Sequence, residues 1–194
     1  MTSRPRPLLS ALVGLIVLAL VAAACTAGTT GPVGSASSGP VGSASTGTGQ
    51  VWRTTLLRDV RTGKEFTIDE LRGKLVAIEP MAIWCANCRI QQREAAAALA
   101  AMPPGAVVYV GVDVDPNEQP EALAAYSAKE GFDWAFVVAS REVARSLAAA
   151  FGDQVLSPPS TPLIMVGPDG SVVDVHFGIR NAEELKTIFA QHLP

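Results

Sequence analysis

The chain has 194 residues, of which 48% are hydrophobic, 6% aromatic and 17% charged, a length that suits one globular domain with additional segments. Fifteen lysines and arginines against 18 aspartates and glutamates give a formal net charge of −3, and no basic cluster occurs, so we expect no binding to nucleic acid. Three cysteines are too few for a disulfide-stapled scaffold, and their odd number leaves one thiol to be explained.

The N-terminal segment combines a basic start with a long apolar run. Arg4 and Arg6 precede residues 8–24, and small residues end the run directly before Cys25. This pattern predicts a secretory signal peptide over residues 1–24. The junction resembles the bacterial lipobox without its usual leucine, and the resemblance implies that Cys25 is lipidated and anchors the protein at the extracytoplasmic face of a bacterial cell membrane. An uncleaved membrane anchor is the alternative.

Residues 25–50 have the composition of a linker. After Cys25 this stretch holds no charged and no aromatic residue, and an eight-residue unit that begins at Gly31 is repeated from Gly39. Glycine, serine and proline dominate, which is typical of a flexible chain that cannot bury a core. We therefore predict a flexible tether over residues 25–50 and a folded domain over residues 51–194.

The first half of the folded domain opens with turn signals and one central strand. Residues 60–64 predict a hairpin turn, and residues 67–71 a short helical turn. The continuous apolar run Leu75–Glu79 is typical of a strand that is buried on both faces of a sheet. Because proline lacks a backbone N–H, Pro80 is expected to end this strand.

The later elements are predicted from apolar runs and capping residues. They are a helix from Cys85 to Met102, a strand over 106–114, a helix over 121–130 with Gly131 as its cap, a strand over 134–138, a helix from Ser140 to Phe151, hairpin strands over 163–166 and 171–177, and a last helix that starts at Asn181 with Glu184 in a capping box. This order predicts an α/β fold, in which a central mixed β-sheet is flanked by helices on both faces.

The sequence Trp84-Cys85-Ala86-Asn87-Cys88 lies between a predicted strand and a predicted helix. Two cysteines in the first turn of a helix can close a small disulfide, and the helix dipole stabilises a thiolate on the first. We therefore expect Cys85 to be the exposed nucleophile and Cys88 the resolving thiol. A structural zinc site needs four ligands and no second cysteine pair exists, so no metal is predicted here.

From about Leu57 to Phe189 the sequence resembles the thioredoxin superfamily, in particular its membrane-tethered, extracytoplasmic branch of the TlpA and ResA type. The matching features are Thr62-Gly63-Lys64, Leu71-Arg72-Gly73-Lys74, Glu79 six residues before Cys85, the Trp-Cys-x-x-Cys motif, Thr161-Pro162, Gly170 and Gly178. The resemblance implies a thioredoxin-like fold with an N-terminal β-hairpin extension and a redox-active disulfide between the motif's two cysteines. It implies no cofactor.

The same resemblance implies roles for residues around the motif. Glu79 would be a buried carboxylate that moves protons for the resolving cysteine, with an ion-paired structural residue as the alternative. Pro162 would follow a cis peptide bond, leaving the backbone of Thr161 as the docking edge for a client segment, and Pro159 is the competing proline. Gly178 would lie beside the same site, and Trp84 would shield the disulfide or simply fill space.

The sequence departs from the family pattern between the two cysteines and in the helix that follows them. Ala86-Asn87 stands between the cysteines where thioredoxins have Gly-Pro, so the reduction potential does not follow from the sequence. Arg93 occupies the place of a helix-kinking proline, which favours a straight helix.

These features favour a thiol-disulfide oxidoreductase of the protein-disulfide reductase type. Its partners would be thiols or disulfides of client proteins and a membrane electron donor or acceptor for thiols. The alternative is a copper chaperone resembling the Sco type, in which Cys85 and Cys88 hold Cu(I) with Met81 or His176. A peroxidase of the redoxin kind ranks last, because Ala82 stands where its threonine is needed.

Overall fold

The structure is a computed structural model that describes residues 50–194. The predicted signal peptide, Cys25 and nearly all of the predicted tether lie outside the described residues. Within residues 50–194, none of the helices has the length and apolar character needed to cross a membrane.

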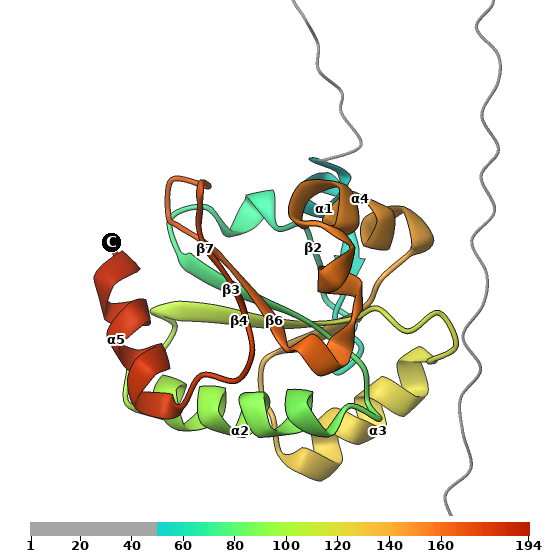
Figure 1. The fold of residues 1–194 in the computed structure, drawn as a ribbon, viewed down its shortest axis with the longest axis horizontal. Coiled ribbons are helices and arrows are strands. Elements are labelled where there is room, and N and C mark those ends of the chain that lie inside the picture. The colour runs from blue at the N-terminus through green and yellow to red at the C-terminus, as the bar shows by residue number, and fades with distance from the viewer. Residues whose placement is uncertain (1–49) are drawn as a thin grey trace, which may run out of the picture. The chain divides into compact units, whose positions relative to one another are not determined.

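A five-stranded mixed sheet lies at the centre of the described residues (Figure 1). Its strands, in spatial order, are β5 (Ala135–Val138), β4 (Val107–Asp113), β3 (Leu75–Met81), β6 (Pro162–Val166) and β7 (Val172–Phe177). Strands β3, β4 and β5 are parallel to one another, whereas β6 pairs antiparallel with β3 and β7 pairs antiparallel with β6. The predicted alternation of strands and helices followed by a hairpin is therefore confirmed.

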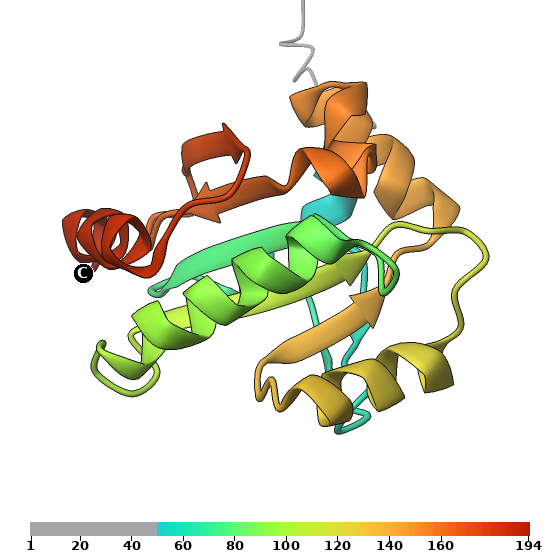
Figure 2. The ribbon, with the colours of Figure 1, turned by 60° about the horizontal axis from the view of Figure 1, so that its bottom comes forward.

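Helices cover both faces of this sheet (Figure 2). They are α1 (Val51–Thr54), α2 (Ala86–Ala100), α3 (Pro120–Glu130), α4 (Arg141–Phe151) and α5 (Ala182–His192). Helices α2, α3 and α5 pack on one face against Leu75 and Ala77 of β3, and α1 and α4 pack on the other face against Val76 and Ile78. Successive side chains of a strand point to opposite faces, so one apolar run in β3 supplies both cores. The predicted fold class is confirmed.

The capping interactions predicted at the helix ends are present in the structure. The Ser140 hydroxyl accepts a hydrogen bond from the Val143 amide at 3.2 Å at the start of α4. Asn181 and Glu184 form a reciprocal capping box at the start of α5. Gly131 ends α3 in the left-handed conformation, with a φ of 77°, which costs little without a side chain.

The predicted N-terminal hairpin consists of β1 (Leu57–Arg58) and β2 (Glu65–Phe66), which pair antiparallel. It covers the outer edge of β5: the Val60 amide donates to the Phe136 carbonyl at 2.8 Å, and the Phe136 amide donates to the Asp59 carboxylate at 3.2 Å. An exposed edge strand can pair with another chain, and the hairpin blocks that edge of the sheet.

Short 3₁₀ helices lie in the connections between the described strands and helices. Helix η2 (Asp69–Leu71) falls within the predicted helical turn at residues 67–71, whereas η3 (Asp153–Leu156) and η4 (Pro158–Ser160) were not predicted. Helix α2 continues through Arg93 without interruption.

The prediction that Pro80 ends the first central strand is wrong, because β3 continues to Met81. The carbonyl of Met81 accepts a hydrogen bond from the Val114 amide, so Met81 directs its polar backbone groups toward β4 and Pro80 directs its own toward β6. Pairing between β3 and β6 ends at Ile78. The missing N–H of Pro80 therefore removes no hydrogen bond from either ladder.

Candidate active site

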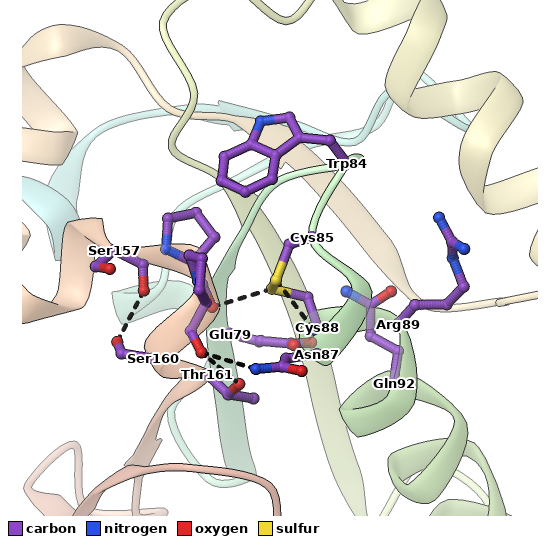
Figure 3. The surroundings of a disulfide bond; sticks show 12 residues. Glu79, Trp84, Cys85, Asn87, Cys88, Arg89, Gln92, Ser157, Ser160 and Thr161 are labelled. Atoms are coloured by element: carbon purple, nitrogen blue, oxygen red, sulfur yellow. Dashed lines mark hydrogen bonds between the residues drawn. A yellow bond between two sulfur atoms is a disulfide. The ribbon is translucent and has the colours of Figure 1, made fainter. Parts of the chain in front are cut away.

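Cys85 and Cys88 form a disulfide at the N-terminus of α2, with a distance of 5.3 Å between their Cα atoms (Figure 3). Cys85 is the N-cap residue of the helix, and its sulfur accepts a hydrogen bond from the Cys88 amide at 3.1 Å. The free N–H groups and the dipole at a helix N-terminus favour negative charge there. A thiolate on Cys85 is therefore stabilised by its position.

Both cysteines are more deeply buried than expected. Cys85 exposes 2% of its surface and Cys88 exposes none, so the prediction of an exposed Cys85 is wrong in the disulfide form. The two residues belong to the apolar core between the sheet and α2, and the Cys88 sulfur lies 3.3 Å from the Pro158 carbonyl oxygen. The exposed part of the motif is instead Trp84, at 56%.

Glu79 lies on β3 among the residues that surround the disulfide (Figure 3). It is completely buried, and its Oε2 accepts a hydrogen bond from the Tyr109 hydroxyl at 2.9 Å. Burial raises the pKa of Glu79 from 4.5 to about 8, although hydrogen bonding to the Tyr109 and Gln92 side chains opposes the rise. Such a carboxyl group can take up or release a proton near neutral pH.

The alternative role for Glu79, an ion-paired structural residue, does not fit its surroundings. Among the described residues no ion pair includes Glu79.

A segment that is distant in the sequence lies against the cysteine pair. The Asn87 side-chain amide donates to the Pro159 carbonyl at 3.1 Å, which joins the start of α2 to η4. Thr161 follows in a left-handed conformation with a φ of 51°, and it alone among the non-glycine residues of the described chain has a positive φ. This conformation is strained for a β-branched residue, and such strain is concentrated at functional sites.

The structure places the other predicted site residues around this segment. Pro162 begins β6 and pairs with Phe177, and Gly178 donates its amide to the Ser160 carbonyl at 2.8 Å. Thr161 and Gly178 therefore lie close together, at the end where β6 begins and β7 ends. The cis peptide bond before Pro162 stays a prediction, as do the docking role of Thr161 and the proposed lipidation of Cys25.

Three acidic residues near the motif were missed by the sequence analysis. The Trp84 indole donates to Asp115 at 2.6 Å, which lowers the pKa of that carboxyl. Glu118 lies with Asp115 in the connection after β4, and Asp113 is the last residue of β4 itself. The available signal was their position at and just after the end of a predicted strand, because the carboxyl ends of neighbouring parallel strands meet at one edge of a sheet. Met81 and Asp113 are register partners at that edge.

A copper site would need a third ligand beside the two cysteines. Met81 is completely buried in β3, and His176 lies on β7 opposite Leu163. Within residues 50–194, no three His, Cys, Asp or Glu side chains come together as a group that could hold a metal ion.

No protein-family model matches the sequence, and no curated protein matches it. Solved structures do match the fold. A thiol:disulfide interchange protein of the thioredoxin family from Chlorobium tepidum has a TM-score of 0.57 and 21% identity, over 72% of this chain and 93% of its own.

A secreted disulfide oxidoreductase of Mycobacterium tuberculosis has a TM-score of 0.56 and 18% identity, over 71% of this chain and 95% of its own. A thiol-disulfide isomerase from Corynebacterium glutamicum has a TM-score of 0.53 and 17% identity, over 69% and 89%. The described domain therefore has a thioredoxin-like fold, and several proteins that share it are thiol-disulfide oxidoreductases.

Proposed function

We propose that the protein is a thiol-disulfide oxidoreductase that exchanges disulfides with client proteins through Cys85 and Cys88. The observation that carries this proposal is the disulfide at the N-terminus of α2, placed beside the buried carboxyl of Glu79. The pKa of Glu79, about 8, lies close to that of an ordinary thiol, near 8.5, so a proton can pass between the two groups with little energy difference.

In the reducing direction, the Cys85 thiolate attacks one sulfur of a client disulfide. A bond forms between Cys85 and the client, and the second client sulfur leaves as a thiolate that takes a proton. Cys88 then loses its proton to Glu79 and attacks the Cys85 sulfur. The Cys85–Cys88 disulfide forms, the first client sulfur leaves, and the client has gained the two electrons that the protein's dithiol has lost.

The order of the two cysteines is supported by their positions. Cys85 is the N-cap and sits where the helix dipole favours a thiolate, whereas Cys88 is inside the first turn and covered by the Pro158 carbonyl. Each turnover needs a donor that reduces the disulfide again, and we assign this role to a membrane partner for thiols. The protein-disulfide reductase type and this partner rest on the sequence resemblance.

We further propose that the protein acts at the extracytoplasmic face of a bacterial membrane, held by a lipid on Cys25. The support is the basic and apolar sequence of residues 1–24 and the uncharged stretch that follows Cys25. An extracytoplasmic compartment is one in which disulfides form and persist, so client disulfides are available there.

The proposal is tested with single-cysteine variants and an insulin-type substrate. The wild-type protein should reduce insulin disulfides in the presence of a dithiol. Cys88→Ser should accumulate a mixed disulfide with the substrate, because the resolving attack is missing, and Cys85→Ser should not. Equal trapping by the two variants would contradict the assigned roles, and absence of exchange in the wild type would contradict the function.

A further inference from the structure

The loop that carries Trp84 and Cys85 is held by charged side chains from outside it. The Ile83 amide donates to both oxygens of the Glu118 carboxylate, at 3.1 and 3.0 Å. On the other side of the same residue, the Arg89 guanidinium lies 3.4 Å from the Ile83 carbonyl oxygen. Hydrogen bonds to ionised groups are stronger than neutral ones, so Glu118 is a principal support of this loop.

Glu118 has a buried neighbour, Asp113, at the end of β4. Asp113 is completely buried, and its Oδ1 accepts a hydrogen bond from the Asp115 amide at 3.0 Å. Its Oδ2 is buried too and has no partner that could donate a hydrogen bond. A buried carboxylate oxygen without a donor is unfavourable, whereas a protonated carboxyl group can itself donate to a neighbouring carboxylate.

The surroundings of Asp113 favour its neutral form. Burial raises its pKa to about 8, and hydrogen bonding to Glu118 is the next largest cause. Two other charged groups lie around the pair. The Asp115 carboxylate raises the pKa of Asp113 further, and the Arg89 guanidinium contacts the carbonyl of Ile83, whose amide Glu118 binds. At pH 7, which lies below this pKa, Asp113 is therefore mainly protonated.

We propose that Asp113 and Glu118 are a proton-sharing pair that positions Cys85: neutral Asp113 donates to Glu118, whose carboxylate fixes the Ile83 amide two residues before the nucleophile. The positioning role rests on the proposed function. Cys85 is the N-cap of α2, so the path of the preceding loop decides how its sulfur meets the helix N-terminus. Deprotonation of Asp113 would place two carboxylates side by side and loosen the loop.

The pairing is tested by a measurement that needs no client protein. Carboxyl ¹³C NMR of the full chain should show Asp113 titrating near pH 8 in the wild type. In Glu118→Gln the amide donates to Asp113, so its titration should move down by about one unit or more, the shift expected for one hydrogen bond to a charged group. Titration of wild-type Asp113 near its ordinary value of 3.8, or no movement in the variant, would overturn the pair.

The positioning role is tested by the rate at which iodoacetamide alkylates Cys85 at pH 7 in the reduced protein. Asp113→Asn keeps a neutral donor and should stay within about twofold of the wild type, whereas Glu118→Ala should react about tenfold more slowly after losing a charge-assisted hydrogen bond. Asp133→Asn, an exposed site after α3, is the control for lost charge. Equal slowing by Asp113→Asn and Glu118→Ala would contradict a neutral donor.

The remaining outcomes cover a variant that does not fold and a failure of the proposed function alone. If Glu118→Ala does not fold, Glu118→Gln replaces it. Its amide oxygen still accepts from the Ile83 amide but without the charge, so alkylation should slow by about fivefold, and an unchanged rate would refute the positioning role. An unchanged rate in a folded Glu118→Ala would refute the positioning role. If the NMR and alkylation results are as expected but the wild type reduces no client disulfide, the proposed function alone fails.

Discussion

Replacement of Glu79 by glutamine should make the protein more stable at neutral pH. Glu79 is completely buried, and its pKa rises from an ordinary 4.5 to about 8 in the folded chain. Between these values the folded protein keeps a proton that the unfolded chain has released. Stability from this group is therefore fully present below pH 4.5 and is lost as the pH rises through about 8.

The size of the effect follows from the pKa difference. One pKa unit corresponds to about 1.4 kcal/mol, so at pH 7 the ionisable group lowers the free energy of unfolding by about 3 kcal/mol relative to acid conditions. Glutamine has the same shape, does not titrate, and can still accept the hydrogen bond from Tyr109. The advantage of Glu79→Gln should be near zero below pH 4.5 and should grow to about 3 kcal/mol at pH 7.

The assay is urea unfolding of both proteins at several pH values between 4 and 8, with Glu65→Gln, an exposed position on β2, as the control. The same Glu79→Gln variant should resolve mixed disulfides at least about tenfold more slowly, because Cys88 loses its proton acceptor. A stability difference that does not change with pH, or a variant that is less stable than wild type at pH 7, would refute the assignment of a proton to buried Glu79.

Two other substitutions test the interior around this site. Tyr109→Phe removes a hydrogen bond that stabilises the Glu79 carboxylate, so the pKa of Glu79 should rise above about 8 by roughly one unit, as measured by carboxyl NMR, and an unchanged or lower value would contradict the contact. Gly111→Ala would place a Cβ atom 2.6 Å from the Phe136 ring. It should lower the free energy of unfolding by about 2 kcal/mol. Phe136→Leu in the same chain should restore part of the loss, and an unaffected Gly111→Ala protein would show that the ring moves freely.

Local signals in the sequence were sufficient for most of the fold. The apolar run that begins at Leu75, the hydroxyl of Ser140 and the capping box of Asn181 each act within a few residues, so their consequences can be predicted without knowing the rest of the chain. The effect of Pro80 could not, because it depends on where β6 stops pairing with β3. Only the sheet register reveals that the proline faces an unpaired stretch.

The features of the candidate site also separate into those that depend on local sequence and those that depend on tertiary packing. The spacing of Cys85 and Cys88 in one helical turn is a local property, and it was enough to predict a disulfide-forming pair, which the structure contains. Their burial depends on packing between α2 and the sheet and on the Pro158 carbonyl, which lies 70 residues from Cys88 in the sequence. No pattern near the motif indicates that contact.

The sequence by itself determined the α/β order, the helix caps and the cysteine pair, because each depends on neighbouring residues or on a short spacing. The resemblance to a known family singled out Glu79 as a candidate proton carrier. Only the tertiary structure decided that Glu79 accepts a hydrogen bond from Tyr109 and that Thr161 is strained beside the disulfide. Such contacts arise when segments far apart in the chain exclude water together, and a linear pattern does not contain those distances.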